Sequence, residues 1–239
     1  DEALKACAPD GNPATPDLQR MHAEILKLQG RPSDALWVYE RLVYENPDDF
    51  GCWNNLGTTK LETGDLDGAL EAFQKARDLD PKSAVVHTNI ARVLMAKDRY
   101  EDACLMLEKA ALLNPDDPAP LVELGRTLTQ IDHTEAGLRA LGAAARLNPK
   151  DPKVFIAIGL AFTDLSQQLQ AERAFKFAVQ ADPSYPAGYL NLGVLFEKAN
   201  RVGELEALIA DARRQNVTGE ELDHGPRVRG KGRPNPGRH

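Results

Sequence analysis

Histidines and cysteines are the side chains of this sequence whose chemistry suits metal binding or nucleophilic catalysis, but their spacing suits neither. The five histidines are His22, His87, His133, His224 and His239. No two of them lie four residues apart and no HExxH motif is present, so the paired ligands of a helical zinc site are missing. The three cysteines, Cys7, Cys52 and Cys104, include no CxxC pair. Three widely separated cysteines argue against a disulfide framework and favour a reducing compartment.

The segment Gly64-Asp65-Leu66-Asp67-Gly68 superficially resembles a calcium loop, because two aspartates lie between glycines. It lacks the full alternation of oxygen ligands and the distal Glu of such a loop, so we interpret it as a turn. No phosphate-binding glycine loop and no GxSxG motif is present. The sequence therefore predicts a protein that is not an enzyme, with no catalytic residue, no cofactor and no metal.

Charge and hydrophobicity narrow the class of partner. The chain of 239 residues has 42% hydrophobic residues, a net charge of −7 and no apolar run long enough to span a bilayer. Five of the 29 basic residues and none of the 36 acidic residues lie in residues 225–239, so residues 1–224 are clearly acidic. An acidic body argues against nucleic acid as a partner. Residues 1–15 contain acidic residues and prolines rather than a secretory signal. We expect a cytoplasmic protein.

Prolines recur along the chain at a fixed interval of 34 residues. They are Pro13, Pro47, Pro81, Pro115, Pro149 and Pro183. Self-similarity on this scale is typical of a solenoid, in which each repeat packs on its neighbours. The residue before a proline is pushed out of helical geometry, so each of these positions predicts the end of a helix.

Each 34-residue period contains two helical patterns. In residues 50–83, Trp53, Leu56 and Leu61 share one face of a first segment that Gly64-Asp65 interrupts. A second segment from Leu66 to Leu79 carries Ala69, Leu70, Phe73 and Ala76 on one face and ends at Asp80-Pro81. Both segments have the spacing of amphipathic helices, and no strand is predicted.

The arrangement Trp53-x2-Leu56-Gly57, followed by Ala69-x3-Phe73, Ala76 and Pro81, resembles the tetratricopeptide repeat. The tyrosine of that pattern is replaced by Lys60. The resemblance implies an all-α, right-handed superhelical solenoid of tandem antiparallel helix pairs. The predicted repeats span residues 16–219, as 16–49, 50–83, 84–117, 118–151, 152–185 and 186–219. We interpret residues 1–15 as the remnant of an upstream repeat or a linker, and residues 220–239 as a disordered basic tail.

In the tetratricopeptide family the first helices line a concave groove that binds extended peptides or a partner's helix. The residue before the Leu-Gly pair projects into this groove, and here it is Asn55, Asn89 and Asn191, with Glu123 and Ala157 between them. A side-chain amide both donates to and accepts from a peptide backbone. This ladder resembles that of the O-linked N-acetylglucosamine transferases. Asparagines that only meet water are an equally weighted alternative.

Further groove candidates lie at neighbouring positions of the first helices. They are Asn54, Thr58, Arg92, Arg126 and Lys153. Arg92 and Arg126 share one repeat position and suit an acidic ligand, although solvated surface arginines are the commoner case. Glu24 and Val85 occupy positions that family members use to clamp a peptide carboxylate, so we expect no binding of chaperone C-terminal tails.

Three functions remain open at this point. The first is a protein-interaction scaffold with a peptide or helix in the groove. The second is an accessory N-terminal region of a larger bacterial enzyme, such as a sulfotransferase or glycosyltransferase. The segments 200–208 and 217–223 resemble bacterial proteins in which such repeats precede a sulfotransferase domain. The third is a scaffold that self-associates through the unfinished ends of its solenoid.

Overall fold

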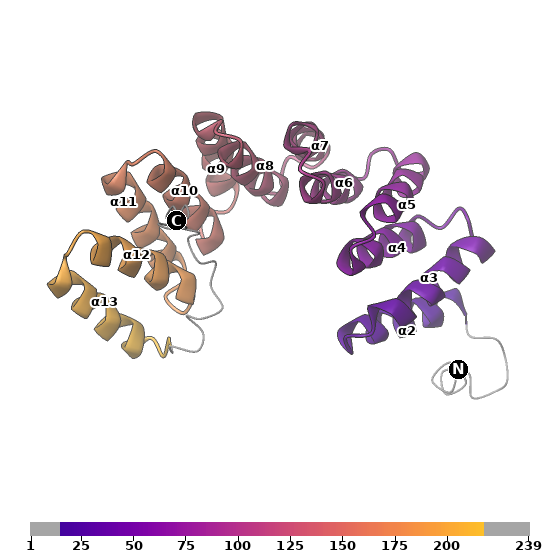
Figure 1. Cartoon of the computed structure of the whole chain (residues 1–239), viewed down its shortest axis with the longest axis horizontal. Coiled ribbons are helices and arrows are strands. Elements are labelled where there is room, and N and C mark those ends of the chain that lie inside the picture. Colours follow the sequence, from indigo (N-terminus) through magenta and orange to yellow (C-terminus); the bar gives the residue numbers. More distant parts are fainter. Residues whose placement is uncertain (1–14, 218–239) are drawn as a thin grey trace, which may run out of the picture. The chain divides into compact units, whose positions relative to one another are not determined.

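The computed structural model describes residues 15–217, and within this range it contains twelve α-helices and no strand. Figure 1 shows consecutive helices joined by short turns into hairpins. The chain divides into two compact units, residues 1–127 and residues 128–239. The helices beginning in the first unit are α2 (Pro16–Leu28), α3 (Pro32–Glu45), α4 (Phe50–Thr63), α5 (Leu66–Leu79), α6 (Ala84–Ala96), α7 (Tyr100–Leu113) and α8 (Ala119–Gln130). Those of the second unit are α9 (Thr134–Leu147), α10 (Pro152–Asp164), α11 (Gln168–Ala181), α12 (Pro186–Lys198) and α13 (Val202–Arg214).

The helix ends follow from local side-chain chemistry. The carboxylate of Asp49 accepts a hydrogen bond from the backbone N–H of Cys52 at 3.0 Å and so caps α4. Gly64 ends the same helix with a left-handed φ of 86°, and Asp65 then caps α5 by accepting from the N–H of Gly68 at 2.9 Å. The predicted turn is therefore confirmed at Gly64-Asp65, whereas Leu66, Asp67 and Gly68 form the first turn of α5.

One left-handed residue occurs in every described hairpin, at intervals of 34 residues. The first two are glycines, Gly30 and Gly64, and the other four are not. These four are Asp98, Asp132, Ser166 and Asn200, with φ between 56° and 64°. Because a Cβ atom is crowded in this conformation, the four turns without glycine are strained, whereas the turns at Gly30 and Gly64 are not.

Small residues let the two helices of a hairpin approach closely. A Cβ atom on Gly57 would lie 2.7 Å from the ring of Phe73, and one on Gly159 would lie 2.3 Å from the ring of Phe175. The two helices thus pack closely at this repeat position in both units. Ala69 is completely buried beside it.

Successive helices pack on one another within each unit, α2 to α7 in the first and α9 to α13 in the second. The core of the first two hairpins centres on Tyr39, Leu42 and Leu56, and that of the last two on Phe175, Leu192 and Phe196. The all-α fold predicted from the sequence is confirmed. The remnant predicted for residues 1–15, apart from Thr15, and the tail predicted for residues 220–239 lie outside the described residues.

Candidate peptide-binding groove

The predicted groove residues are divided between the two units. Asn54, Asn55 and Thr58 lie on α4, Asn89 and Arg92 on α6, and Arg126 on α8, all in the first unit. Lys153 lies on α10 and Asn191 on α12, both in the second unit.

Two of the predicted asparagines bind each other across neighbouring hairpins. The side-chain amide of Asn89 donates to the side-chain oxygen of Asn54 at 2.9 Å, which links α6 to α4. Asn89 is only 8% exposed, whereas Asn54 is partly exposed. Since an amide has two N–H donors and an oxygen with two lone pairs, this bond orients both side chains and leaves hydrogen-bonding capacity on each.

Asn55 is partly exposed, and its side chain lies next to the Tyr39 hydroxyl. The Tyr39 hydroxyl donates to the Glu24 carboxylate and also hydrogen-bonds the side chain of Asn55. Burial, followed by the Glu24 carboxylate, raises the pKa of Tyr39 far above its usual range, so the hydroxyl stays protonated. The Glu24 carboxylate is therefore doubly unsuited to clamping a peptide carboxylate, because it is acidic and already accepts a hydrogen bond from Tyr39.

Thr58, Arg92 and Arg126 share one repeat position on α4, α6 and α8. The Thr58 hydroxyl donates to the backbone carbonyl of Asn54 at 3.0 Å. The Arg92 guanidinium lies 3.8 Å from the carboxylate of Glu123, the residue that interrupts the asparagine ladder, and its side chain remains 51% exposed. Arg126 is exposed, with no ion pair among the described residues. The two arginines are therefore accessible to an acidic ligand.

A cavity of about 490 Å³ lies beside Asn55, on the surface of α2. It is lined by Asp17, Arg20, Met21, Glu24, Ile25, Leu28 and Asn55. The apolar part of this cavity was not predicted from the sequence. The signal was available, because Met21 lies 34 residues before Asn55 and so occupies the ladder position of the first hairpin.

In the second unit, the asparagine at the repeat position of Asn55 is buried. Asn191 is 3% exposed and donates to the backbone carbonyl of Ala187, one turn earlier in α12, at 2.7 Å. The cavity beside it has a volume of only about 60 Å³. Lys153 is exposed at the start of α10. Asn191 therefore lacks the accessible surface of Asn55.

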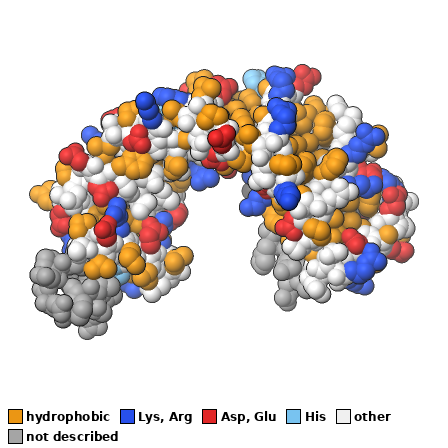
Figure 2. Space-filling model, turned by 180° about the vertical axis from the view of Figure 1, so that it is seen from behind, with side chains coloured by type: hydrophobic (Ala, Val, Ile, Leu, Met, Phe, Trp, Pro, Cys, Tyr) orange, Lys and Arg blue, Asp and Glu red, His pale blue; other side chains and the backbone are white. Residues whose placement is uncertain are grey.

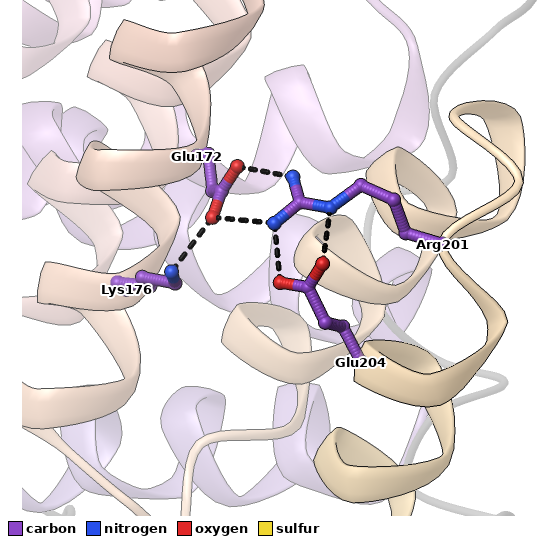
Figure 3. Close-up of polar contacts among 4 residues, drawn as sticks. All are labelled: Glu172, Lys176, Arg201 and Glu204. Atoms are coloured by element: carbon purple, nitrogen blue, oxygen red, sulfur yellow. Dashed lines mark hydrogen bonds and ion pairs between the residues drawn. The ribbon is translucent and has the colours of Figure 1, made fainter.

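A charged cluster in the second unit holds α11 to the last hairpin (Figure 3). The Arg201 guanidinium donates to Glu172 at 2.5 Å and, through Nε, to Glu204 at 2.6 Å, and Lys176 donates to Glu172 at 2.6 Å. Hydrogen bonds from Arg201 lower the pKa of Glu172 to about 2, although burial acts in the opposite direction. The charges in this cluster satisfy one another, which is typical of a structural tie.

Residues 15–217 offer little other chemistry. No group of three possible metal ligands occurs among these residues, and Cys52 and Cys104 are free and buried. Burial raises the pKa of Cys52 to about 12, so its reactive thiolate is not populated near neutral pH. None of the described helices is both long and apolar enough to cross a membrane. Acidic and basic side chains are interspersed on the face shown in Figure 2.

Comparison with known proteins identifies the repeat. The family model described as "Tetratricopeptide repeat" matches residues 60–104, which run from the end of α4 into α7. The chain contains tetratricopeptide repeats. Human Superkiller complex protein 3 is 31% identical over 74 residues, or 31% of this chain. The matched segment spans 5% of that protein's length.

Solved structures share the fold of these tetratricopeptide repeats at low sequence identity. The type IV pilus biogenesis factor PilW has a TM-score of 0.72 at 16% identity, over 87% of this chain and 96% of that one. MamA from Desulfovibrio magneticus has a TM-score of 0.63 at 21% identity, over 71% and 96%. YrrB, described as a TPR protein with an unusual peptide-binding site, has a TM-score of 0.54 at 21% identity, over 78% and 96%.

Proposed function

We propose that this protein is a non-catalytic protein-interaction scaffold, and that the first helices of its first unit bind an extended peptide or a partner's helix. The observation that carries the proposal is the row of amides formed by Asn54, Asn55 and Asn89. The bond between Asn54 and Asn89 fixes two of these side chains across a hairpin boundary, and the third, Asn55, lies next to the Tyr39 hydroxyl. Fixed amides lose little conformational freedom when they bind a ligand.

The chemistry of this surface defines the expected ligand. Amide groups match the alternating donors and acceptors of a peptide main chain, with little regard for its sequence. Arg92 and Arg126, one and two hairpins beyond Thr58, add a preference for acidic side chains. We therefore expect an extended, acidic peptide segment. The peptide-binding site named for YrrB supports such a use of this fold.

The test is binding to an array of extended peptides by the whole chain and by the Asn55→Ala/Asn89→Ala double variant. We expect the wild type to select peptides, acidic ones foremost, and the double variant to lose them. Gln74→Ala is the matched control, since Gln74 is an exposed amide on the second helix of the same hairpin. Loss of binding in this control, or unchanged binding in the double variant, would contradict the proposal.

The cost of losing the Asn54–Asn89 bond must be separated from the loss of binding. Removing it is expected to lower the free energy of unfolding by about 1 kcal/mol. Circular dichroism of the double variant checks that it remains folded. The Arg92→Glu/Arg126→Glu variant keeps the amides and is expected to reject acidic peptides selectively.

The setting of the protein is part of the same proposal. Free, buried Cys52 and Cys104 support a reducing compartment such as a bacterial cytoplasm. None of the similar proteins described above is named as a sulfotransferase or glycosyltransferase, so no observation favours the accessory role beside such an enzyme. Self-association is a second proposal, favoured by exposed apolar residues on α2 and α13.

A further inference from the structure

The last hairpin exposes a residue whose repeat position is buried elsewhere. Ile209 on α13 is 44% exposed. The residues at the same position of the five earlier described hairpins are each at most 2% exposed: Tyr39, Phe73, Leu107, Leu141 and Phe175. Among the described residues no helix covers this face of α13. Because Ile209 is as apolar as its buried counterparts, we attribute its exposure to the lack of a covering helix among the described residues.

The uncovered face of α12 and α13 forms an apolar groove of about 770 Å³. Its apolar lining includes Leu190, Val194, Leu205, Leu208, Ile209 and Ala212. One hairpin earlier, the equivalent face is covered by α12, whose Leu192 packs against Ala171 and Phe175 of α11. The groove thus has the lining that accepts the first helix of another hairpin.

Helix α2 has the complementary property. Ile25 is 46% exposed, whereas four residues at its repeat position on later first helices, Thr59, Val93, Thr127 and Ala161, are at most 2% exposed and the fifth, Leu195, is partly buried. Met21, Ile25 and Leu28 lie on one stripe of the helix at spacings of four and three residues. The position of Ile25 packs on the preceding hairpin in later repeats, as the bond from Thr127 to Met95 shows, whereas Met21 stands at the ladder position and the position of Leu28 is exposed in later first helices as well.

The first and the last described hairpins each carry one residue equivalent to a member of the Glu172–Arg201 ion pair. Glu206 on α13 lies 34 residues after Glu172, and Arg31 before α3 lies five such intervals before Arg201. Arg31 pairs with Asp34 at 2.6 Å, as Arg201 pairs with the acidic residue three positions on. Glu206 is exposed and forms no ion pair within the described residues. Each end therefore holds one half of an ion pair that the second unit forms internally.

We propose that the protein associates head to tail with a second copy of itself. Helix α2 of one copy occupies the apolar groove on α12 and α13 of the other, and Arg31 of the first pairs with Glu206 of the second. The contact continues the 34-residue register across the two molecules. Such an interface is heterologous, because it joins two different surfaces. The interface covers the cavity that Met21, Ile25 and Leu28 share with Asn55, but the charge reversals alter only Arg31 and Glu206, so either proposal can fail alone.

Sedimentation velocity of the full chain over a concentration series tests this interface. We expect concentration-dependent association of the wild type. Arg31→Glu and Glu206→Arg should each weaken it about tenfold or more, because each places like charges at the contact. The double variant Arg31→Glu/Glu206→Arg restores opposite charges and should recover association. Glu108→Arg is the matched control, since Glu108 is an exposed acid inside α7.

Several results would overturn the proposal. A wild type that is monomeric at every concentration would mean that residues 218–239 or a different protein covers the groove. Association that survives both single reversals, or that the double variant fails to recover, would place the interface elsewhere. Circular dichroism checks that each variant is folded, and peptide binding by the charge variants is expected to be unchanged.

Discussion

The second and the last described hairpins place the same Leu-Gly pair in different surroundings. In α4, a Cβ atom on Gly57 would lie 2.7 Å from the ring of Phe73. In α12, a Cβ atom on Gly193 would meet only Cδ1 of Leu205, at 3.5 Å, and one other side chain at 3.7 Å. Ile209 stands where the earlier hairpin has Phe73. Glycine is therefore required at Gly57, where the Phe73 ring leaves no room for a Cβ atom, but not at Gly193, where a Cβ atom fits.

The asparagine before each pair differs in the same way. Asn55 remains partly exposed beside a cavity, whereas Asn191 is buried and donates to its own helix. Both occupy one position of the 34-residue period. The repeat position decides where a side chain points from its helix, but neighbouring side chains decide whether a ligand can reach it.

The largest expected effect tests the comparison between Gly57 and Gly193. Gly57→Ala should lower the free energy of unfolding by about 2 kcal/mol, because the added methyl group meets the Phe73 ring. Gly193→Ala should raise it by about 0.5 kcal/mol, because alanine favours a helix and the site has room. Urea unfolding followed by circular dichroism measures both changes. Equal costs at the two positions would contradict this account of the packing.

Much of the fold could be predicted from the sequence, because its determinants are local. The proline interval and the Gly64-Asp65 turn act within a few residues of themselves, and Gly57 and Phe73 are fixed by the repeat pattern. The bond between Asn54 and Asn89 could not be predicted, since it depends on how two hairpins are rotated against each other.

The burial of Asn191 was also beyond prediction from the repeat pattern. That pattern gave Asn55 and Asn191 the same environment. The tie between Glu172 and Arg201 joins residues 29 apart that match no repeat signature. These features depend on particular neighbours, which a single sequence does not place.

An effect of similar size concerns the charged cluster of the second unit, which has no counterpart at the equivalent position in the first, where Leu70 replaces Glu172. Since Glu172 has an ordinary pKa of 4.5 when unfolded and about 2 when folded, its contribution is present above pH 4.5 and is lost as the pH falls toward 2. Glu172→Gln should cost about 2 kcal/mol at neutral pH and remove this part of the acid sensitivity.

Hydrogen exchange of α11 and α13 between pH 3 and pH 6 localises that loss to the second unit. Glu204→Gln is the control, because Glu204 is exposed and contacts Arg201 alone. It should have the smaller effect. An acid sensitivity that persists in Glu172→Gln would show that another carboxylate is responsible.

The smallest expected effect concerns the left-handed turn residues, which are glycines in the first two hairpins and not in later ones. Ser166→Gly should raise the free energy of unfolding by about 0.5 to 1 kcal/mol, because it relieves the strain of a positive φ. Gly64→Ala should lower it by about 1 kcal/mol for the same reason. Thermal melting compares the two, and a gain from Gly64→Ala would contradict the account.

Side-chain amide NMR during peptide titration tests the central claim most directly. The claim is that the first unit offers asparagines to a ligand and the second does not. An acidic peptide selected from the array should shift the amide signals of Asn54, Asn55 and Asn89 and leave that of Asn191 unchanged. A ligand that shifts Asn191 while the three first-unit signals stay in place would contradict it.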